Sequence, residues 1–237
     1  MSENVRPEIA IRPFVDGDAL QVRELFVLVN RRLSPPNMRD AFEAYIARSL
    51  IEEMDRIVAY YGERDGGFWV ALKEHNFVGM FGLERVSPDA LELRRMYVAP
   101  SARRNGIARR MLLQAEAECR RRRIPKLVLS TSELQDAARS LYQRAGYTLV
   151  REATIDESSN KTVGAGIRRY YYEKTWRTGR HCRKRTPAAW PDLRNQPKLM
   201  ARRMSHPREL RYADTQLRRG VSATTTSERS STGASRA

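Results

Sequence analysis

Apolar and polar positions along the chain form patterns that predict strands and helices in turn. Residues 19–33 place apolar side chains at positions 22, 25, 26 and 29, which is one face of a helix. A second helix is expected around residues 42–50. Strands are expected at residues 8–14, 68–72, 77–83 and 91–98, with the middle two joined into a hairpin by a turn at residues 73–76.

The clearest helix begins near residue 107, where Ile107, Met111, Ala115 and Cys119 recur every four residues. The strand expected next, at residues 126–130, has an apolar Leu-Val-Leu centre. Strands that are apolar throughout are typical of the middle of a sheet, where both faces are covered. We therefore expect this strand to have a neighbour on each side.

A last helix is expected at residues 137–145. Ser132 and Gln135 have the spacing of a capping box before it, and Gly146 stands where a left-handed cap belongs after it. Two strands, at residues 147–151 and 167–174, complete the chain's pattern. The order β-α-α-β-β-β-α-β-α-β-β predicts a mixed α/β sheet with helices on both faces.

Composition changes this picture at the C-terminus. Of the net charge of +16, most lies in residues 177–237, which carry 15 Lys or Arg against 4 Asp or Glu. This segment has five residues of the Leu, Ile, Val and Phe set, and nine of its last 18 residues are Ser or Thr. So few apolar groups cannot offset the entropy of ordering the segment. We expect residues 1–176 to form the folded domain and residues 177–237 to be a disordered, low-complexity extension, the basic tail.

Several classes of protein are excluded by what the sequence lacks. There is no apolar run near 18 residues, as a membrane-spanning helix requires, and the N-terminus has no apolar core of a signal peptide. Cys119 and Cys182 are 63 positions apart, which is neither a metal-binding nor a redox spacing. We expect a cytoplasmic protein without a bound metal, a disulfide framework or a membrane partner.

Candidate chemistry lies at the junction between the strand at residues 91–98 and the helix from residue 107. Gly106 stands at the start of the helix, with Arg103, Arg104 and Arg109 around it. A helix N-terminus offers unpaired N–H groups and the positive end of the helix dipole, and both bind phosphate. These residues alone leave open an ordinary strand-to-helix turn with solvated arginines. Neither a Walker loop nor a dinucleotide fingerprint is present.

Two motifs in this region resemble the GNAT superfamily of acyl-CoA N-acyltransferases. Residues 103–108, Arg-Arg-Asn-Gly-Ile-Ala, match the family's pyrophosphate loop, Gln/Arg-x-x-Gly-x-Gly/Ala. Tyr142, followed by Gly146 and Tyr147, matches the tyrosine that the family carries in a helix before a Gly-aromatic pair. The resemblance covers residues 9–174 in element order. It implies an α/β (α+β) fold of the GNAT type, with a mixed, mostly antiparallel sheet of about seven strands, and it implies acetyl-CoA as co-substrate.

The resemblance also implies roles for individual residues. Glu92 would accept the proton of the amine, commonly through water, and Tyr142 would protonate the departing CoA thiolate. The implied coenzyme-binding residues run from the strand through the loop to the next helix, with Gln135 in place of the family's more common Asn: Met96, Val98, Arg103, Arg104, Asn105, Gly106, Ile107, Ala108 and Gln135. The residues themselves leave alternatives open, because Glu92 also fits a surface position facing an arginine, and Tyr142 fits an interior aromatic.

The implied reaction requires groups of these types. An alkylamine has a pKa near 10.4, so at neutral pH it must lose a proton before it attacks a thioester. A carboxylate can accept that proton, and a hydroxyl can assist the leaving thiolate. The first hypothesis is therefore an N-acetyltransferase whose acceptor is a primary amine of a small molecule, an amino acid or a peptide. In the resembled family the connection between the last two strands often lines the acceptor site, so residues 158–166, polar and rich in glycine, are a candidate substrate loop.

A second hypothesis belongs to a different class of protein. A catalytically idle domain that senses acyl-CoA would be joined to a basic tail that binds nucleic acid. Nucleic acid is not the expected partner under the first hypothesis, and under the second it would bind only through the tail. A homodimer is left open.

Overall fold

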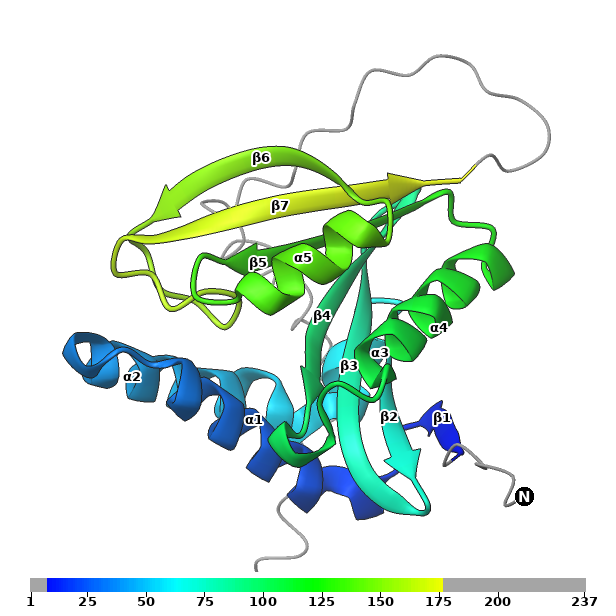
Figure 1. Ribbon diagram of the computed structural model, residues 1–237, viewed down its shortest axis with the longest axis horizontal. Coiled ribbons are helices and arrows are strands. Elements are labelled where there is room, and N and C mark those ends of the chain that lie inside the picture. Colours follow the sequence, from blue (N-terminus) through cyan, green and yellow to red (C-terminus); the bar gives the residue numbers. More distant parts are fainter. Residues whose placement is uncertain (1–7, 177–237) are drawn as a thin grey trace, which may run out of the picture. The chain divides into compact units, whose positions relative to one another are not determined.

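A computed structural model describes residues 8–176 of the chain. Residues 1–7 and the basic tail lie outside the described residues, so the expected domain boundary and the expected disorder of the tail stay predictions. The described residues contain one seven-stranded sheet with the strand order β1-β2-β3-β4-β5-β7-β6 (Figure 1). The strands are β1 (Ile9–Pro13), β2 (Gly67–Lys73), β3 (Asn76–Ser87), β4 (Ala90–Val98), β5 (Lys126–Ser132), β6 (Thr148–Ile155) and β7 (Ile167–Thr175).

Strand pairing is antiparallel throughout this sheet, except between β4 and β5, which run parallel. The predicted mixed, mostly antiparallel sheet of about seven strands is confirmed. The apolar strand expected in the middle of the sheet is β5, which pairs with β4 on one side and β7 on the other.

Helices cover both faces of the sheet, as predicted (Figure 1). On one face, α4 (Ile107–Arg121) and α5 (Asp136–Arg144) pack over a core that includes Leu91, Met111 and Tyr172; we call this the α4–α5 face. On the other, the α1–α3 face, α1 (Ala19–Leu33), α2 (Arg39–Glu52) and α3 (Ile57–Gly62) pack over a core that includes Phe26 and Met80. Helix α3 was not predicted, because six residues are too few for a periodic pattern to stand out.

One irregularity in β4 positions the candidate site. Met80 pairs with Tyr97 and Gly82 with Arg94, so that two residues, Arg95 and Met96, lie opposite one residue of β3. This is a β-bulge, and Arg95 adopts a left-handed conformation with φ of 52°. Pairing between β4 and β5 ends at Leu93, which faces Leu129. Within the described residues, β4 therefore has an open edge from residue 94 to residue 98, on the side where β5 leaves it.

The predicted capping box at Ser132 is wrong. Helix α5 begins at Asp136 with Gln135 as its N-cap, and Ser132 is the last residue of β5, where it pairs with Arg169. Sheet pairing thus extends the strand through the position that local sequence assigns to the helix cap. The predicted left-handed cap at Gly146 is confirmed, with φ of 80°.

Candidate active site

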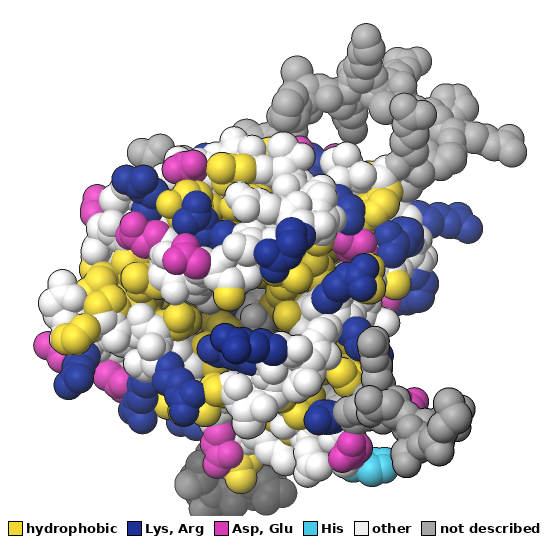
Figure 2. All heavy atoms as spheres, viewed as in Figure 1, with side chains coloured by type: hydrophobic (Ala, Val, Ile, Leu, Met, Phe, Trp, Pro, Cys, Tyr) yellow, Lys and Arg dark blue, Asp and Glu magenta, His cyan; other side chains and the backbone are white. Residues whose placement is uncertain are grey.

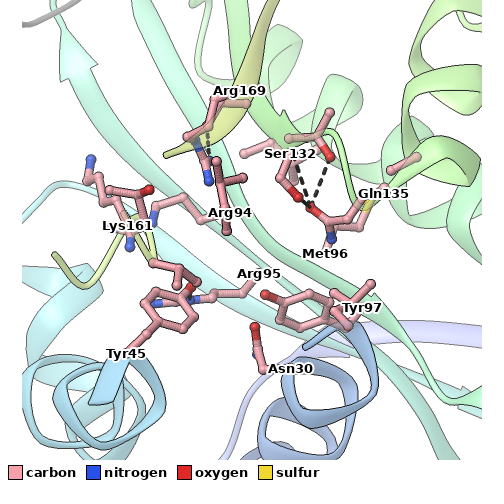
Figure 3. A pocket seen from close by; sticks show the side chains of 18 of the residues that line it. Asn30, Tyr45, Arg94, Arg95, Met96, Tyr97, Ser132, Gln135, Lys161 and Arg169 are labelled. Atoms are coloured by element: carbon pink, nitrogen blue, oxygen red, sulfur yellow. Dashed lines mark hydrogen bonds between the residues drawn. The ribbon is translucent and has the colours of Figure 1, made fainter. Parts of the chain in front are cut away.

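A cleft opens where β4 and β5 diverge, and it brings together side chains far apart in the sequence (Figure 3). Four residues of the predicted site line it: Glu92, Met96, Gln135 and Tyr142. The space inside amounts to about 110 Å³, enough for several waters or a small reacting group. Lys161, Thr162 and Val163 also line the cleft, so the polar segment at residues 158–166 does reach it, as expected.

The other predicted residues lie beyond the cleft. Val98 ends β4, residues 103–106 form the turn into α4, and Ile107 and Ala108 are the first residues of that helix. Arg104 and Gly106 adopt left-handed conformations with φ of 65° and 73°. Nothing lies within 4 Å of a Cβ built on Gly106, so it is the backbone conformation that requires glycine here.

Backbone N–H groups at the start of α4 are open to a ligand. The first hydrogen bond of the helix runs from the Arg110 N–H to the Gly106 carbonyl, at 3.0 Å. Within the described part of the chain, the N–H groups of residues 104–109 have no hydrogen-bond acceptor. Arg103, Arg104 and Arg109 are exposed and make no ion pair with a described carboxylate. Six open donors and three free cations fit the pyrophosphate of a coenzyme.

Asn105 supports this turn from within. Its side-chain Nδ2 donates to the Ala102 carbonyl at 3.2 Å. Ile107 is buried in the core of the α4–α5 face, which anchors the first turn of the helix. These two members of the predicted loop therefore fix its shape through their side chains, and their backbone N–H groups remain available as donors.

Glu92 is buried against a cation on the α1–α3 face. It is 7% exposed and lies directly opposite Glu84 of β3. Lys161 Nζ contacts Glu92 Oε2 at 2.8 Å and also contacts Glu84. Two facing carboxylates repel each other, and the lysine between them relieves that repulsion. The alternative of a surface glutamate facing an arginine is wrong, because the residue is buried and its cation is a lysine.

Electrostatics fix the charge of this lysine. Burial on its own lowers the pKa of Lys161, but the negative charges of Glu92 and Glu84 outweigh burial and raise that pKa above its ordinary value. The pKa of Glu84 lies well below its usual range, because Arg94 and Lys161 outweigh the cost of burying it. Lys161 and Glu84 are therefore both charged at neutral pH.

Two consecutive arginines form a buried network that sequence reasoning missed. Because of the bulge, Arg94 and Arg95 both reach Glu53, which follows α2, with guanidinium contacts of 2.8 Å and 2.7 Å to its Oε2. Burial opposes ionisation of Glu53, but the two guanidinium groups hold its pKa below the ordinary value. Both arginines also donate to the Asn160 carbonyl, at 3.2 Å and 2.6 Å. An Arg-Arg pair inside a mostly apolar strand was the available signal.

Tyr142 is both an interior aromatic and a cleft residue. It is 5% exposed, and its ring centroid lies 6.0 Å from those of Tyr147 and Tyr172 on the α4–α5 face. Burial raises the pKa of Tyr142 well above its ordinary value, so it keeps its proton at neutral pH. The structure thus places a protonated hydroxyl-bearing residue on the side of the cleft that α5 covers.

Gln135 borders the cleft beside Met96 (Figure 3). Its Oε1 accepts a hydrogen bond from Thr131 Oγ1 at 3.0 Å. Among the described residues, no group accepts from its Nε2. The amide therefore keeps donors available to a ligand that enters between β4 and β5.

Residues 8–176 contain neither a candidate metal cluster nor a candidate membrane-spanning helix. No group of three or more His, Cys, Asp or Glu side chains is arranged to hold a metal ion there. No helix in the same residues has the length and apolar character needed to cross a bilayer.

Two curated proteins whose names refer to N-acetylation are similar to part of this chain. N-acetyltransferase 8 of Homo sapiens is 31% identical over 109 residues, covering 44% of this chain and 48% of that protein. N-acetylaspartate synthetase of Danio rerio is 31% identical over 116 residues, covering 48% of this chain and 41% of that protein. The chain thus spans about half the length of the curated relatives it matches.

Solved structures share the fold at low sequence identity. PaiA N-acetyltransferase from Thermoplasma acidophilum, in complex with coenzyme A, is 18% identical with a TM-score of 0.55, covering 71% of this chain and 99% of that one. An acetyltransferase of the GNAT family from Staphylococcus aureus Mu50 is 19% identical, with the same TM-score and coverage. Residues 35–147 match the model of the acetyltransferase (GNAT) family. The chain therefore contains a GNAT acetyltransferase domain.

Proposed function

We propose that this chain is an N-acetyltransferase that moves an acetyl group from acetyl-CoA to a primary amine. The observation that carries the proposal is the cleft between β4 and β5, which joins the two faces of the sheet. Glu92 lies on its α1–α3 side and Tyr142 on its α4–α5 side. A base and a proton donor thus flank one opening. The names of the two curated relatives, both N-acetylating proteins, agree with this reaction.

The donor half of the site suits coenzyme A. Bound acetyl-CoA would supply the thioester whose carbonyl the amine attacks. The N–H groups of residues 104–109 hold the pyrophosphate, and backbone groups of Met96 and Val98, on the open edge of β4, hold the amide-bearing arm. Gln135 adds a side-chain amide beside that edge. Most of these groups belong to the backbone, so they can bind the coenzyme without particular side chains.

The acceptor half has one available base. Glu92 Oε2 is taken by Lys161, but no described side chain donates to its Oε1, which remains available to an amine or to a bridging water. Glu84 is a poor base, because its pKa is depressed and both its oxygens already bind cations. We therefore assign proton removal to Glu92.

Tyr142 acts on the leaving group. A thiol has a pKa of about 8.5, and a tyrosine with a raised pKa holds its proton more tightly than that. Complete transfer to the thiolate is therefore uphill, and stabilisation by a donated hydrogen bond is the part of the role that the energetics favour. Solvent protonates the thiolate after it leaves.

The alternative function, an idle acyl-CoA sensor with a nucleic-acid-binding tail, has no observation in its favour. Its binding arm would be the basic tail, which lies outside the described residues. Release of free CoA thiol, measured with the full chain across a panel of primary amines, decides between the two. Amine-dependent release, together with the acetylated amine identified by mass spectrometry, is the expected result. Tight CoA binding without thiol release for any amine would favour the sensor hypothesis.

A further inference from the structure

Charge on the acceptor side of the cleft is almost fully balanced. Five charged residues line the cleft: Glu92, Arg94, Arg95, Lys161 and Arg169. Glu53 and Glu84 neutralise the two consecutive arginines, and Glu92 and Glu84 hold the lysine. Arg169 is the exception, because it makes no ion pair with any described carboxylate. One positive charge in the cleft is left without a counter-ion.

Arg169 lies on the same face of the sheet as Glu92. Its neighbour Tyr170 and Tyr172 belong to the core of the α4–α5 face, and successive side chains of a strand point to opposite faces. Arg169 therefore points to the α1–α3 face. Leu91 and Leu93 place Glu92 on that face by the same rule. The open N–H groups of α4, which suit the coenzyme phosphates, are on the other face. Arg169 thus belongs to the acceptor side.

The guanidinium of Arg169 is positioned by one hydrogen bond and keeps other donors without a described acceptor. Its Nη2 donates to Ser130 Oγ at 2.6 Å, across the paired strands β5 and β7. Figure 3 shows its side chain directed into the cleft, toward Arg94 and on the same side as Lys161. Its Nε and Nη1 have no described acceptor. Ser130 takes one of the two Nη2 hydrogens, so the other Nη2 hydrogen can act together with either Nε or Nη1. Either pair of donors suits a carboxylate, which takes two parallel hydrogen bonds.

The surroundings favour an anion as well. Figure 2 shows dark-blue Lys and Arg side chains beside the hollow in the middle of this view. Ser130 lines the cleft next to Arg169, and because its Oγ accepts from Arg169, its own proton can be donated to the same anion. Ile167, two residues before Arg169, is apolar and buried, which limits competition from water.

We propose that Arg169 binds a carboxylate carried by the amine acceptor, so that the substrates are amines that also bear a carboxylate, such as amino acids or peptides. This inference rests on the proposed function, because it assigns a part of the same acceptor site. The ammonium end of the acceptor lies toward Glu92, and its carboxylate end lies toward Arg169. The spacing between the two groups is set by the distance between these side chains.

Kinetics with matched amines test the proposal. Glycine, β-alanine and 4-aminobutyrate vary the spacing between amine and carboxylate, and each is compared with its carboxamide. In the native chain at least one carboxylate should have a kcat/KM about tenfold to a hundredfold above its amide, the usual effect of a charge-assisted hydrogen-bonded pair. Arg169→Gln should lower kcat/KM of the carboxylates through KM, and should do so far more than for the amides, so that the preference is lost. Arg169→Lys should restore part of it.

Arg168→Gln is the matched control. Arg168 is the adjacent residue, its side chain is exposed, and it does not line the cleft. Its replacement should keep the preference. Equal kcat/KM for carboxylates and amides in the native chain, or an equal loss for both in Arg169→Gln, would overturn the proposal.

A binding measurement without turnover can test the carboxylate site separately from the proposed acetyltransferase function. The three carboxylates are titrated into the native chain and Arg169→Gln by calorimetry, with no acetyl-CoA present. Binding that Arg169→Gln loses supports the carboxylate site even where no amine is acetylated. The carboxylate site is contradicted if the native chain binds none of the three probes and shows no kinetic preference. Amine-dependent thiol release would still support the proposed function in that case.

Discussion

The two sides of the cleft bind by different means. On the α1–α3 face, Glu53, Glu84, Glu92, Arg94, Arg95 and Lys161 are buried or nearly so and bind mostly one another. On the α4–α5 side, the groups available to a ligand are backbone N–H donors at residues 104–109 and the edge of β4. The acceptor side is thus built from paired side chains, and the donor side from backbone that has no partner within the described residues.

The buried ion network affects the stability of the fold, whereas the open backbone donors affect ligand binding. A buried ion network stabilises the fold only while it is complete, since removing one partner leaves the other charge without compensation. Open backbone donors contribute nothing to folding until a ligand arrives. Changes to the paired charges of the acceptor side should therefore lower the free energy of unfolding in addition to any effect on the reaction. Changes on the donor side should alter affinity and rate with little effect on the free energy of unfolding.

The largest effect is expected from Glu53→Gln. It removes the one carboxylate shared by Arg94 and Arg95, and should lower the free energy of unfolding by about 3–5 kcal/mol, the usual cost of breaking a buried pair. Denaturant titration at neutral pH measures it. Glu43→Gln, which breaks an exposed pair with Arg31, is the control and should change little. Similar losses for both variants would show that the buried network does not support the fold.

The pH dependence of stability has a defined sign. Because the pKa of Glu53 is lowered in the folded state, its contribution is complete above the ordinary glutamate value of about 4.3 and is lost as pH falls toward the lower folded-state value. Acid titration of the native chain should show this loss, and Glu53→Gln should show less of it.

Tyr142→Phe should act on rate alone. The change keeps the ring contacts with Tyr147 and Tyr172 and removes only the hydroxyl. Turnover should fall by a factor on the order of 10²–10³, the usual effect of removing one hydrogen-bond donor to a developing negative charge, while CoA affinity is retained. Tyr147→Phe, in the same aromatic group but outside the cleft lining, should keep its turnover. Full turnover of Tyr142→Phe at saturating acetyl-CoA would make Tyr142 a packing residue.

Glu92→Gln should change the shape of the pH–rate profile. The amide keeps the size of the side chain but cannot accept a proton, so the rate should fall most at neutral pH. It should recover partly at alkaline pH, where more of the amine is already neutral. A profile with the same shape as that of the native chain would assign proton removal to another group.

The smallest effect is expected from deleting the basic tail. Its composition offers few apolar groups to a core, so the melting temperature and the acetyl transfer of residues 1–176 should stay nearly unchanged. Thermal unfolding and thiol release measure both. Loss of soluble protein on deletion would place the domain boundary elsewhere.

The donor side could be predicted from the sequence, and most of the acceptor side could not. A backbone site leaves a local signature, because Gly106 must adopt a left-handed conformation and the motif around it is contiguous. Glu92 was predicted from the family resemblance, but its partners Lys161 and Glu84 are 69 and 8 residues away. Pairings of this kind depend on register and on the β4 bulge, which no local pattern encodes.

The fold shows the same division. Long amphipathic segments, such as α1 at Ala19–Leu33, were predicted with their observed bounds. Short segments were missed or misplaced: α3 is too short for periodicity, and Ser132 joined β5 because its pairing with Arg169 outweighs a local capping preference. Arg169 itself gave no signal, since an arginine near the start of a strand is common on any surface.

Coenzyme binding by the open N–H groups of α4 can be measured by thermal unfolding of the protein with and without CoA. CoA should raise the melting temperature of the native chain, with a stabilisation of about 2.7 kcal/mol at a hundredfold excess over its dissociation constant. Gly106→Pro should lose the shift, because proline cannot adopt the φ of 73° observed at this position and has no N–H to donate. No shift of the native chain at millimolar CoA, or an equal shift in Gly106→Pro, would contradict this role of the N–H groups.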